Sequence, residues 1–213
     1  MSGYFIAFEG IDGSGKSTVA ELIAGRLRSE GYDVLVTHEP TREKFGRHIY
    51  EILSSKDHVV TPFELQRLYV LDRKEHVHTV IRPALLRGQI VIGDRYWLST
   101  LAYGMLSGLA ENLIQLHEEI FQGDFLKPDM TFIFDISADT ALERLKNISK
   151  GKDYFEQVDK LSSIRKNYLA LCHTANMDCV IVDAAVALDS IVATILHQLS
   201  PRLPDRKTKE DAI

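Results

Sequence analysis

A glycine-rich segment near the amino terminus carries the strongest chemical signal in the sequence. The run FIAFEGIDGSGKST, residues 5–18, has the spacing GxxxxGK[ST] and joins an apolar run to a segment of helical period. Glycines in such a loop let backbone N–H groups converge on phosphate oxygens, and the following helix adds the positive end of its dipole. Lys16 supplies a charge for the β- and γ-phosphates, and the Ser17 hydroxyl suits Mg²⁺. The predicted triphosphate-binding residues are Gly10, Gly13, Ser14, Gly15, Lys16, Ser17 and Thr18.

A second polar pair follows an apolar run in GQIVIGDRYWLSTLAYG, residues 88–104. Ligands of α/β sheets bind at the carboxyl ends of the strands, where Asp94 and Arg95 are expected. Asp94 is predicted to hold Mg²⁺ through water, with a strand-end turn cap as the alternative. Arg95 offers a planar fork for a phosphate, with a surface ion pair as the alternative. Asp135 also ends an apolar run, but no cation or hydroxyl cluster follows it, which favours a structural role.

A phosphate-binding loop alone does not separate a kinase from a GTPase switch or a motor ATPase. The sequence has no guanine-reading NKxD, and DxxG occurs only inside the glycine-rich segment. A switch protein is therefore disfavoured.

Short apolar runs alternate with segments of helical period along the chain. This pattern is typical of a parallel sheet covered on both faces by helices. The expected strands are residues 4–8, 34–37, 89–92, 131–135 and 179–182. We therefore predict an α/β fold with a five-stranded parallel sheet, formed as one domain by residues 1–200. Residues 201–213, rich in proline and charge, are predicted to be a disordered tail.

Apolar residues at helical spacing between these runs predict amphipathic helices over residues 19–27 and 65–81. Gly31 and Gly88 stand where these helices should end. A short helix is expected over residues 141–145. The run KNISKGKD, residues 146–153, then interrupts the apolar rhythm, and we predict a mobile cationic lid at about residues 146–156.

Composition excludes several classes of protein. A net charge of −5 and a pI near 5.9 disfavour nucleic-acid binding. The sequence lacks an apolar stretch of about 18 residues and a secretory leader pattern, so neither a membrane span nor export is expected, and the compartment is predicted to be cytoplasmic. Cys172 and Cys179 match no CxxC or Cys/His pattern and are predicted to be buried thiols rather than a disulfide or a metal site.

Several motifs in fixed order resemble the thymidylate kinase family. They are FEGIDGSGKST, HEP at 38–40, LDRKEHVHTVIRPALLRGQIVIGDRY at 71–96, SxxAY at 99–103, KPD at 127–129 and ALERL at 141–145. The resemblance reaches residue 184. It implies a P-loop NTPase fold with a small lid, transfer of the γ-phosphate of ATP to dTMP, Mg²⁺ as cofactor, and a homodimer.

The resemblance also assigns roles to individual side chains. Asp12 would contact the acceptor near its sugar and phosphate, Tyr69 would stack on thymine, and Arg73 would hydrogen-bond the base. Tyr103 would pack against the deoxyribose and Arg144 would lie along adenine. The other acceptor-binding residues are Glu39, Pro40, Arg42, Arg95, Ser99 and Thr100. The structural alternatives are core packing for both tyrosines, an ion pair with Asp72 for Arg73, and an exposed helix surface for Arg144.

The residues that assist transfer are expected to be cations. Some members of the family carry an arginine in the glycine-rich loop, where this sequence has Gly13, so the remaining cation is expected from the lid. The predicted catalytic residues are Asp12, Lys16, Arg95, Lys150 and Lys152. Two alternatives remain open: a kinase of another pyrimidine nucleotide or deoxynucleoside, and a nucleotide-binding regulatory protein without turnover.

Overall fold

A five-stranded parallel sheet forms the centre of the computed structural model, which describes residues 3–55, 60–145, 152–174 and 177–204. The strands lie in the order β2-β3-β1-β4-β5. Their bounds are β1 Tyr4–Glu9, β2 Val34–His38, β3 Ile90–Asp94, β4 Met130–Asp135 and β5 Cys179–Asp183. The predicted sheet of five parallel strands is confirmed; β4 ends where predicted, and the other four strands end one or two residues later.

The strand register brings the predicted site residues to one edge of the sheet. Phe8 of β1 pairs with Asp94 of β3, and His38 of β2 pairs with the same residue. Beyond the strands, the Arg95 N–H donates to the Phe8 carbonyl at 2.8 Å, and the Glu39 N–H donates to the Asp94 carbonyl at 3.0 Å. The segments that follow β1, β2 and β3 therefore meet at the carboxyl edge.

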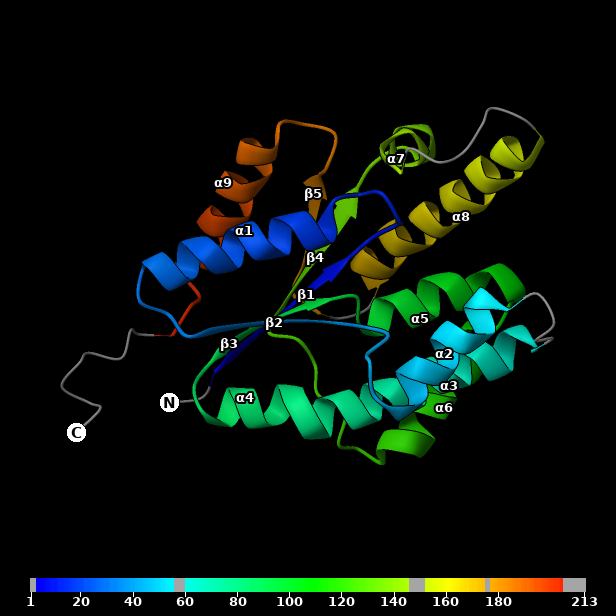
Figure 1. Ribbon diagram of the computed structural model, residues 1–213, viewed down its shortest axis with the longest axis horizontal. Helices are drawn as coiled ribbons and strands as arrows, with labels where there is room; N and C mark the ends of the chain where they lie inside the picture. The colour runs from blue at the N-terminus through cyan, green and yellow to red at the C-terminus, as the bar shows by residue number, and fades with distance from the viewer. Residues whose placement is uncertain (1–2, 56–59, 146–151, 175–176, 205–213) are drawn as a thin grey trace.

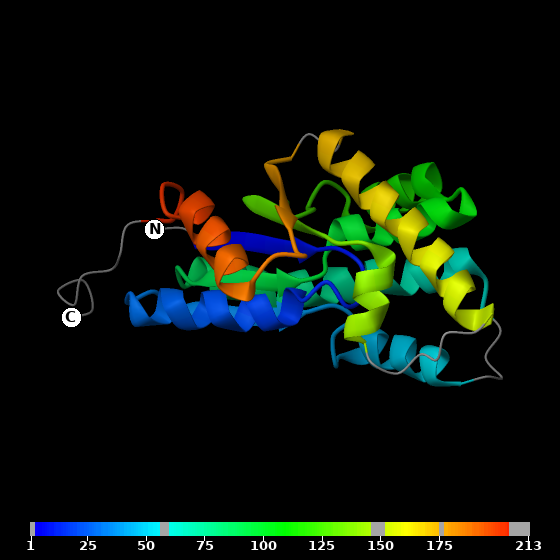
Figure 2. The ribbon, with the colours of Figure 1, turned by 90° about the horizontal axis from the view of Figure 1, so that it is seen from above.

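Helices cover both faces of the sheet (Figure 1). Alternate residues of β1 divide the interior: Ile6 and Phe8 pack with α1 (Lys16–Ser29) and α9 (Leu188–Leu199), whereas Phe5 and Ala7 pack with the helices of the opposite face. The remaining elements are α2 Lys44–Ser54, α3 Pro62–His76, η1 Val77–Ile81, α4 Arg82–Leu86, α5 Trp97–Gly104, η2 Met105–Ser107, α6 Ala110–Phe121, α7 Ala138–Arg144 and α8 Lys152–Thr174. Figure 2 shows α2, α7 and the start of α8 toward the same end of the molecule.

Local sequence signals set the ends of α3 and of the helical turns that continue it. Thr61 caps α3: its hydroxyl accepts from the Glu64 N–H, and the Glu64 carboxylate accepts from the Thr61 N–H. The helix continues through the π-helical turn η1 into α4, and Gly88 follows with a φ of 79°. The predicted helix over residues 65–81 and its glycine stop are therefore confirmed.

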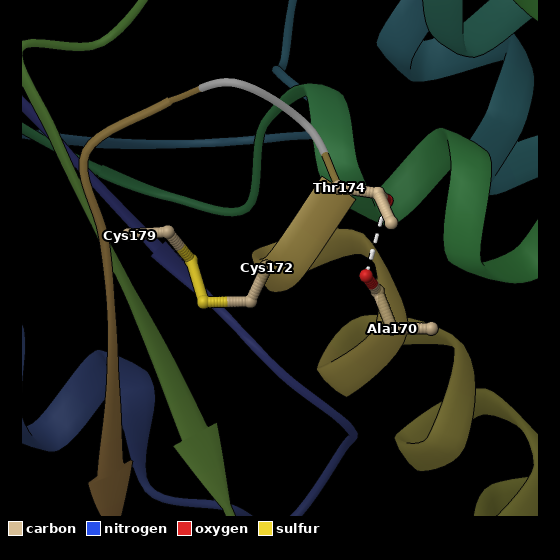
Figure 3. Close-up of a disulfide and its surroundings, with 4 residues drawn as sticks. All are labelled: Ala170, Cys172, Thr174 and Cys179. Carbon is tan, nitrogen blue, oxygen red and sulfur yellow. Dashed lines mark hydrogen bonds between the residues drawn. A yellow bond between two sulfur atoms is a disulfide. The ribbon is translucent and has the colours of Figure 1, made fainter.

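The two cysteines correct the sequence analysis, because they form a disulfide rather than two thiols (Figure 3). Cys172 lies near the end of α8 and Cys179 is the first residue of β5, with Cα atoms 5.6 Å apart. This distance is within the usual range for a disulfide. Cys172 and Cys179 come together because β5 follows α8 in the chain and lies beside its end. No local cysteine motif in the sequence predicts this pairing.

The structure also refines two predicted boundaries. Residues 146–151 of the predicted lid lie outside the described residues, whereas 152–156 belong to α8. At the start of the predicted tail, Leu203 packs against the core and Arg202 pairs with Asp178 at 3.4 Å, so ordered contacts continue to this point. In the described part of the chain, no helix is long and apolar enough to cross a membrane.

Candidate functional site

The P-loop, residues 10–18, follows β1 and is held in place by two other elements. Gly10, Gly13 and Gly15 have φ values of 141°, 80° and 92°, which favour glycine. A Cβ on Gly13 would lie 2.2 Å from the carbonyl oxygen of Ala141 in α7, and one on Gly10 would lie 2.8 Å from that of Phe134. The helix α1 begins at Lys16 without a side-chain cap, which leaves the N–H groups of its first turn for an anion.

Lys16 is folded into this loop. Its ammonium donates to the Ile11 carbonyl at 3.0 Å and to the Ser14 hydroxyl at 3.4 Å, and the residue is only 6% exposed. Burial, together with the nearby Arg95, lowers the pKa of Lys16 to about 8, against the opposite effect of Asp94 and Asp12. The loop therefore concentrates positive charge that an anionic ligand would stabilise.

Asp94, at the end of β3, lies beside Ser17 of the P-loop; these are the two residues predicted to bind the metal ion. The Ser17 hydroxyl donates to Oδ2 of Asp94. The other carboxylate oxygen, Oδ1, is buried and has no hydrogen-bond partner in the described structure. An unpartnered carboxylate oxygen next to a hydroxyl is a donor set that Mg²⁺ accepts, so these residues fit the predicted ion.

Arg95 connects the P-loop to the acceptor side of the site. Its φ of 70° is in the left-handed region, a strained conformation for arginine that directs the side chain toward the P-loop. Nη2 contacts the Asp12 carboxylate at 2.6 Å, and Nη1 lies 3.2 Å from the Gly10 carbonyl. Burial alone would raise the pKa of Asp12, but Arg95 and Lys16 lower it overall, so this carboxylate is ionised at neutral pH.

A buried network behind Arg95 uses two residues that sequence analysis missed, Glu9 and Tyr168. The Ser99 hydroxyl donates to Glu9 at 2.5 Å and lies 2.8 Å from the Tyr168 hydroxyl and 3.2 Å from Nη1 of Arg95. Glu9 also accepts from the backbone N–H groups of Tyr96 and Ser99, and burial raises its pKa. Ser99, predicted to bind substrate, thus already has a protein partner for its proton and for both lone pairs.

A cavity of about 370 Å³ opens beside Arg95, within the size range of small-molecule sites. Seven predicted residues line it: Asp12, Pro40, Tyr69, Arg95, Ser99, Thr100 and Tyr103. Five further lining residues were not predicted: Tyr50, Leu53, Leu65, Gln66 and Lys160. Burial raises the pKa of Tyr69 to about 12, and the Tyr103 hydroxyl donates to Asp12 at 3.3 Å. Helical spacing from Tyr69 could have indicated Gln66, whereas Lys160 and Tyr50 gave no signal.

Arg73 is placed differently from the prediction that it hydrogen-bonds the base. It is 1% exposed and lies outside the cavity lining. Nε donates to Glu39, Nη1 donates to Thr100 and to Nε2 of His117, and Nη2 donates to the Tyr96 carbonyl. All three nitrogens are therefore engaged within the protein, and a direct contact with a base would require one of these partners to be released. Glu39, a predicted acceptor-binding residue, is likewise buried in this ion pair, at 2.7 Å from Nη2.

His117 completes this buried cluster as a neutral acceptor. Burial lowers its pKa to about 2, and the adjacent Arg73 guanidinium acts in the same direction. Its Nδ1 lies 3.1 Å from the Leu113 carbonyl, which assigns the proton to that nitrogen and leaves Nε2 to accept from Arg73.

The remaining predicted residues lie at the rim or outside the described structure. Arg42 is exposed and stacks 4.9 Å above the ring of Tyr50, which lines the cavity. Arg144 is exposed on the last turn of α7, so its contact with adenine stays a prediction. Lys150 lies outside the described residues, and Lys152 begins α8 without a described side chain.

The chain is similar to known proteins over most of its length. The family model described as thymidylate kinase matches residues 8–195. A thymidylate kinase of Pseudomonas fluorescens is 38% identical over 211 residues, covering 97% of this chain and 99% of the relative. A probable thymidylate kinase of Pyrococcus abyssi is 36% identical over 208 residues, covering 93% and 98%. Since both the family model and these relatives extend over most of the chain, this protein belongs to the thymidylate kinase family.

Proposed function

We propose that this protein transfers the γ-phosphoryl group of ATP to dTMP, giving ADP and dTDP. The observation that carries the proposal is the position of Arg95 between two binding regions. Its guanidinium reaches the P-loop at Gly10 and Asp12 and also lines the cavity of about 370 Å³. A nucleotide phosphate in that cavity would face a triphosphate on the P-loop, which is the approach that transfer between two phosphates requires.

Charge neutralisation is the main task of the site. In the transfer step, an acceptor phosphate oxygen bonds to the γ-phosphorus while the bond to the β,γ-bridging oxygen breaks, and ADP leaves with that electron pair. The second pKa of a phosphate monoester is about 6, so the acceptor is a dianion near pH 7 and needs no general base. Lys16 and Arg95 are the cations that would reduce repulsion between the two anions.

The residues around Arg95 hold it for this role. The network of Glu9, Ser99 and Tyr168 limits the orientation of Nη1, and Asp12 holds Nη2. An entering phosphate would compete with Asp12 for the exposed side of the guanidinium, because the Asp12 side chain is 60% exposed. Ser17 and Asp94 would hold Mg²⁺, which when bound offsets negative charge on the phosphates of ATP.

The test is an ADP-release assay with ATP, Mg²⁺ and a panel of acceptors: dTMP, dUMP, dCMP, thymidine and deoxycytidine. We expect the highest kcat/KM with dTMP and turnover that disappears when Mg²⁺ is chelated. A higher kcat/KM for a nucleoside or for dCMP would identify a different kinase. Binding of ATP without ADP release with any acceptor would favour a regulatory protein and refute the proposal.

Three features expected of the family remain predictions for this chain. Association into a homodimer can be measured by light scattering coupled to size exclusion, and a cytoplasmic location by cell fractionation. A catalytic cation from Lys150 or Lys152 can be tested by replacing both with methionine, which should lower kcat at least tenfold at saturating substrates.

A further inference from the structure

The side chain of Gln66 ends in an amide that opens onto the cavity. It lies on α3, is 8% exposed and lines the cavity beside Arg95. In the part of the chain that the structure describes, no hydrogen bond is made by its amide. An amide has two N–H groups and a carbonyl oxygen to pair, and among the described residues none of these groups of Gln66 is occupied. This amide is therefore available to a ligand in the cavity.

The neighbours of Gln66 indicate which part of a nucleotide would lie against it. Tyr69 follows one helical turn later on α3, and both residues line the same cavity together with the apolar Leu65. At the end of the cavity beside the P-loop, Arg95 and Asp12 form the part that would hold an anionic group of the ligand. With the phosphate at Arg95, the aromatic and apolar wall around Tyr69 receives the base, and Gln66 belongs to that wall.

Arg73 does not compete with Gln66 for the base. Its three nitrogens donate to Glu39, Thr100, His117 and the backbone, behind the cavity wall. Thr100 accepts from Arg73 at 3.0 Å and lines the cavity, and its own hydroxyl proton has no acceptor among the residues described. Arg73 therefore acts on the cavity through Thr100, whereas Gln66 faces it directly.

A carboxamide matches the edge of thymine. Thymine presents the acceptor O4 beside the donor N3–H, and a glutamine amide presents a donor beside an acceptor at similar spacing. We infer that Gln66 recognises the acceptor nucleotide by donating its N–H to O4 and accepting from N3–H of the base. This inference depends on the proposed function, and it makes Gln66 a determinant of acceptor specificity.

The test replaces Gln66 with methionine, which has a similar length and no hydrogen-bonding amide. Calorimetry without ATP measures the Kd for dTMP and for its 5-methylpyrimidin-2-one analogue, which lacks both O4 and the N3 proton. We expect Gln66→Met to raise the Kd for dTMP at least tenfold and to change the Kd for the analogue less than threefold. In the kinase assay KM for dTMP should rise while kcat stays within threefold, because the lost bonds form equally in the bound and transition states.

Two further variants complete the experiment. Gln115→Met, at an exposed glutamine of α6, is the matched control and should change neither Kd. Gln66→Glu keeps the size of the side chain but lacks the N–H donor, so it should also raise the Kd for dTMP at least tenfold. This variant replaces Gln66→Met in the test if the methionine variant does not fold.

The outcomes separate this inference from the proposed function. If the wild type phosphorylates dTMP but Gln66→Met binds it within twofold of wild type, only the role of Gln66 is wrong. The same conclusion follows if Gln66→Met raises the Kd for dTMP and the Kd for the analogue by equal factors. If the wild type neither binds nor phosphorylates dTMP, the proposed function and this inference are both overturned.

Discussion

Replacing Lys16 with methionine should remove catalysis and stabilise the unliganded protein at the same time. The ammonium is the P-loop charge for the transferred phosphates, and loss of one such preorganised group typically lowers kcat by at least about 10²-fold. The same ammonium is buried next to Arg95, which lowers its pKa. A charge that helps bind ATP therefore destabilises the fold in the absence of ATP.

The size of the stabilisation follows from the pKa of Lys16, which falls from 10.5 to about 8. At about 1.4 kcal/mol per pH unit, this difference corresponds to about 3 kcal/mol. The unfolded chain binds the Lys16 proton more tightly than the folded protein does. The charged ammonium therefore lowers the free energy of unfolding by the full amount below pH 8, and this loss of stability disappears as the pH rises toward 10.5. The lost hydrogen bonds to Ile11 and Ser14 offset part of the gain, which leaves about 1–3 kcal/mol at pH 7.

The measurement is urea unfolding of wild type and Lys16→Met at several pH values from 7 to 10. We expect the free energy of unfolding of the variant to exceed that of wild type by about 1–3 kcal/mol at pH 7, and this difference to shrink above pH 8. Lys166→Met, at an exposed lysine of α8, is the control and should leave both stability and kcat unchanged. A variant less stable than wild type at pH 7, or a difference independent of pH, would refute the desolvation argument. A kcat within tenfold of wild type would refute the assignment of the P-loop.

Three other substitutions test the surroundings of the site. Gly13→Ala places a Cβ against the backbone of α7 at a φ of 80°, so ATP turnover should fall at least tenfold, whereas Gly25→Ala, with open space around it, should leave activity intact; equal activity of the two would contradict the packing of the P-loop. Arg73→Met leaves the buried Glu39 without its cation and should lower the free energy of unfolding by about 3–5 kcal/mol, and a loss below about 1 kcal/mol would argue against this ion pair. Cys172→Ser opens a disulfide whose cysteines are seven positions apart and should cost about 2–3 kcal/mol, an effect that reductant should reproduce in wild type and not in the variant.

The sequence alone determined the sheet, the P-loop and the family. The central strands β1, β3 and β4 are buried on both faces and appear as short apolar runs, and the edge strands β2 and β5 carry similar runs, so all five could be found without knowledge of their partners. Gly31 and Gly88 follow the ends of their helices with φ values of 93° and 79°. Glycine adopts such positive φ values readily because it has no Cβ, so these helix ends could be predicted from the residue type alone. The GxxxxGK[ST] spacing is equally local, because one turn of backbone forms the whole phosphate-binding loop.

Only the tertiary structure decided which polar side chains are used by the protein and which face the cavity. Gln66 and Arg73 lie seven positions apart on α3, yet one amide is left free while the guanidinium is fully engaged. Ser99 finds Glu9 and Tyr168 at separations of 90 and 69 residues, and no local pattern encodes such partners. The physical reason is that a buried polar group must be satisfied by whatever group the fold brings within about 3 Å, and that depends on distant segments of the chain.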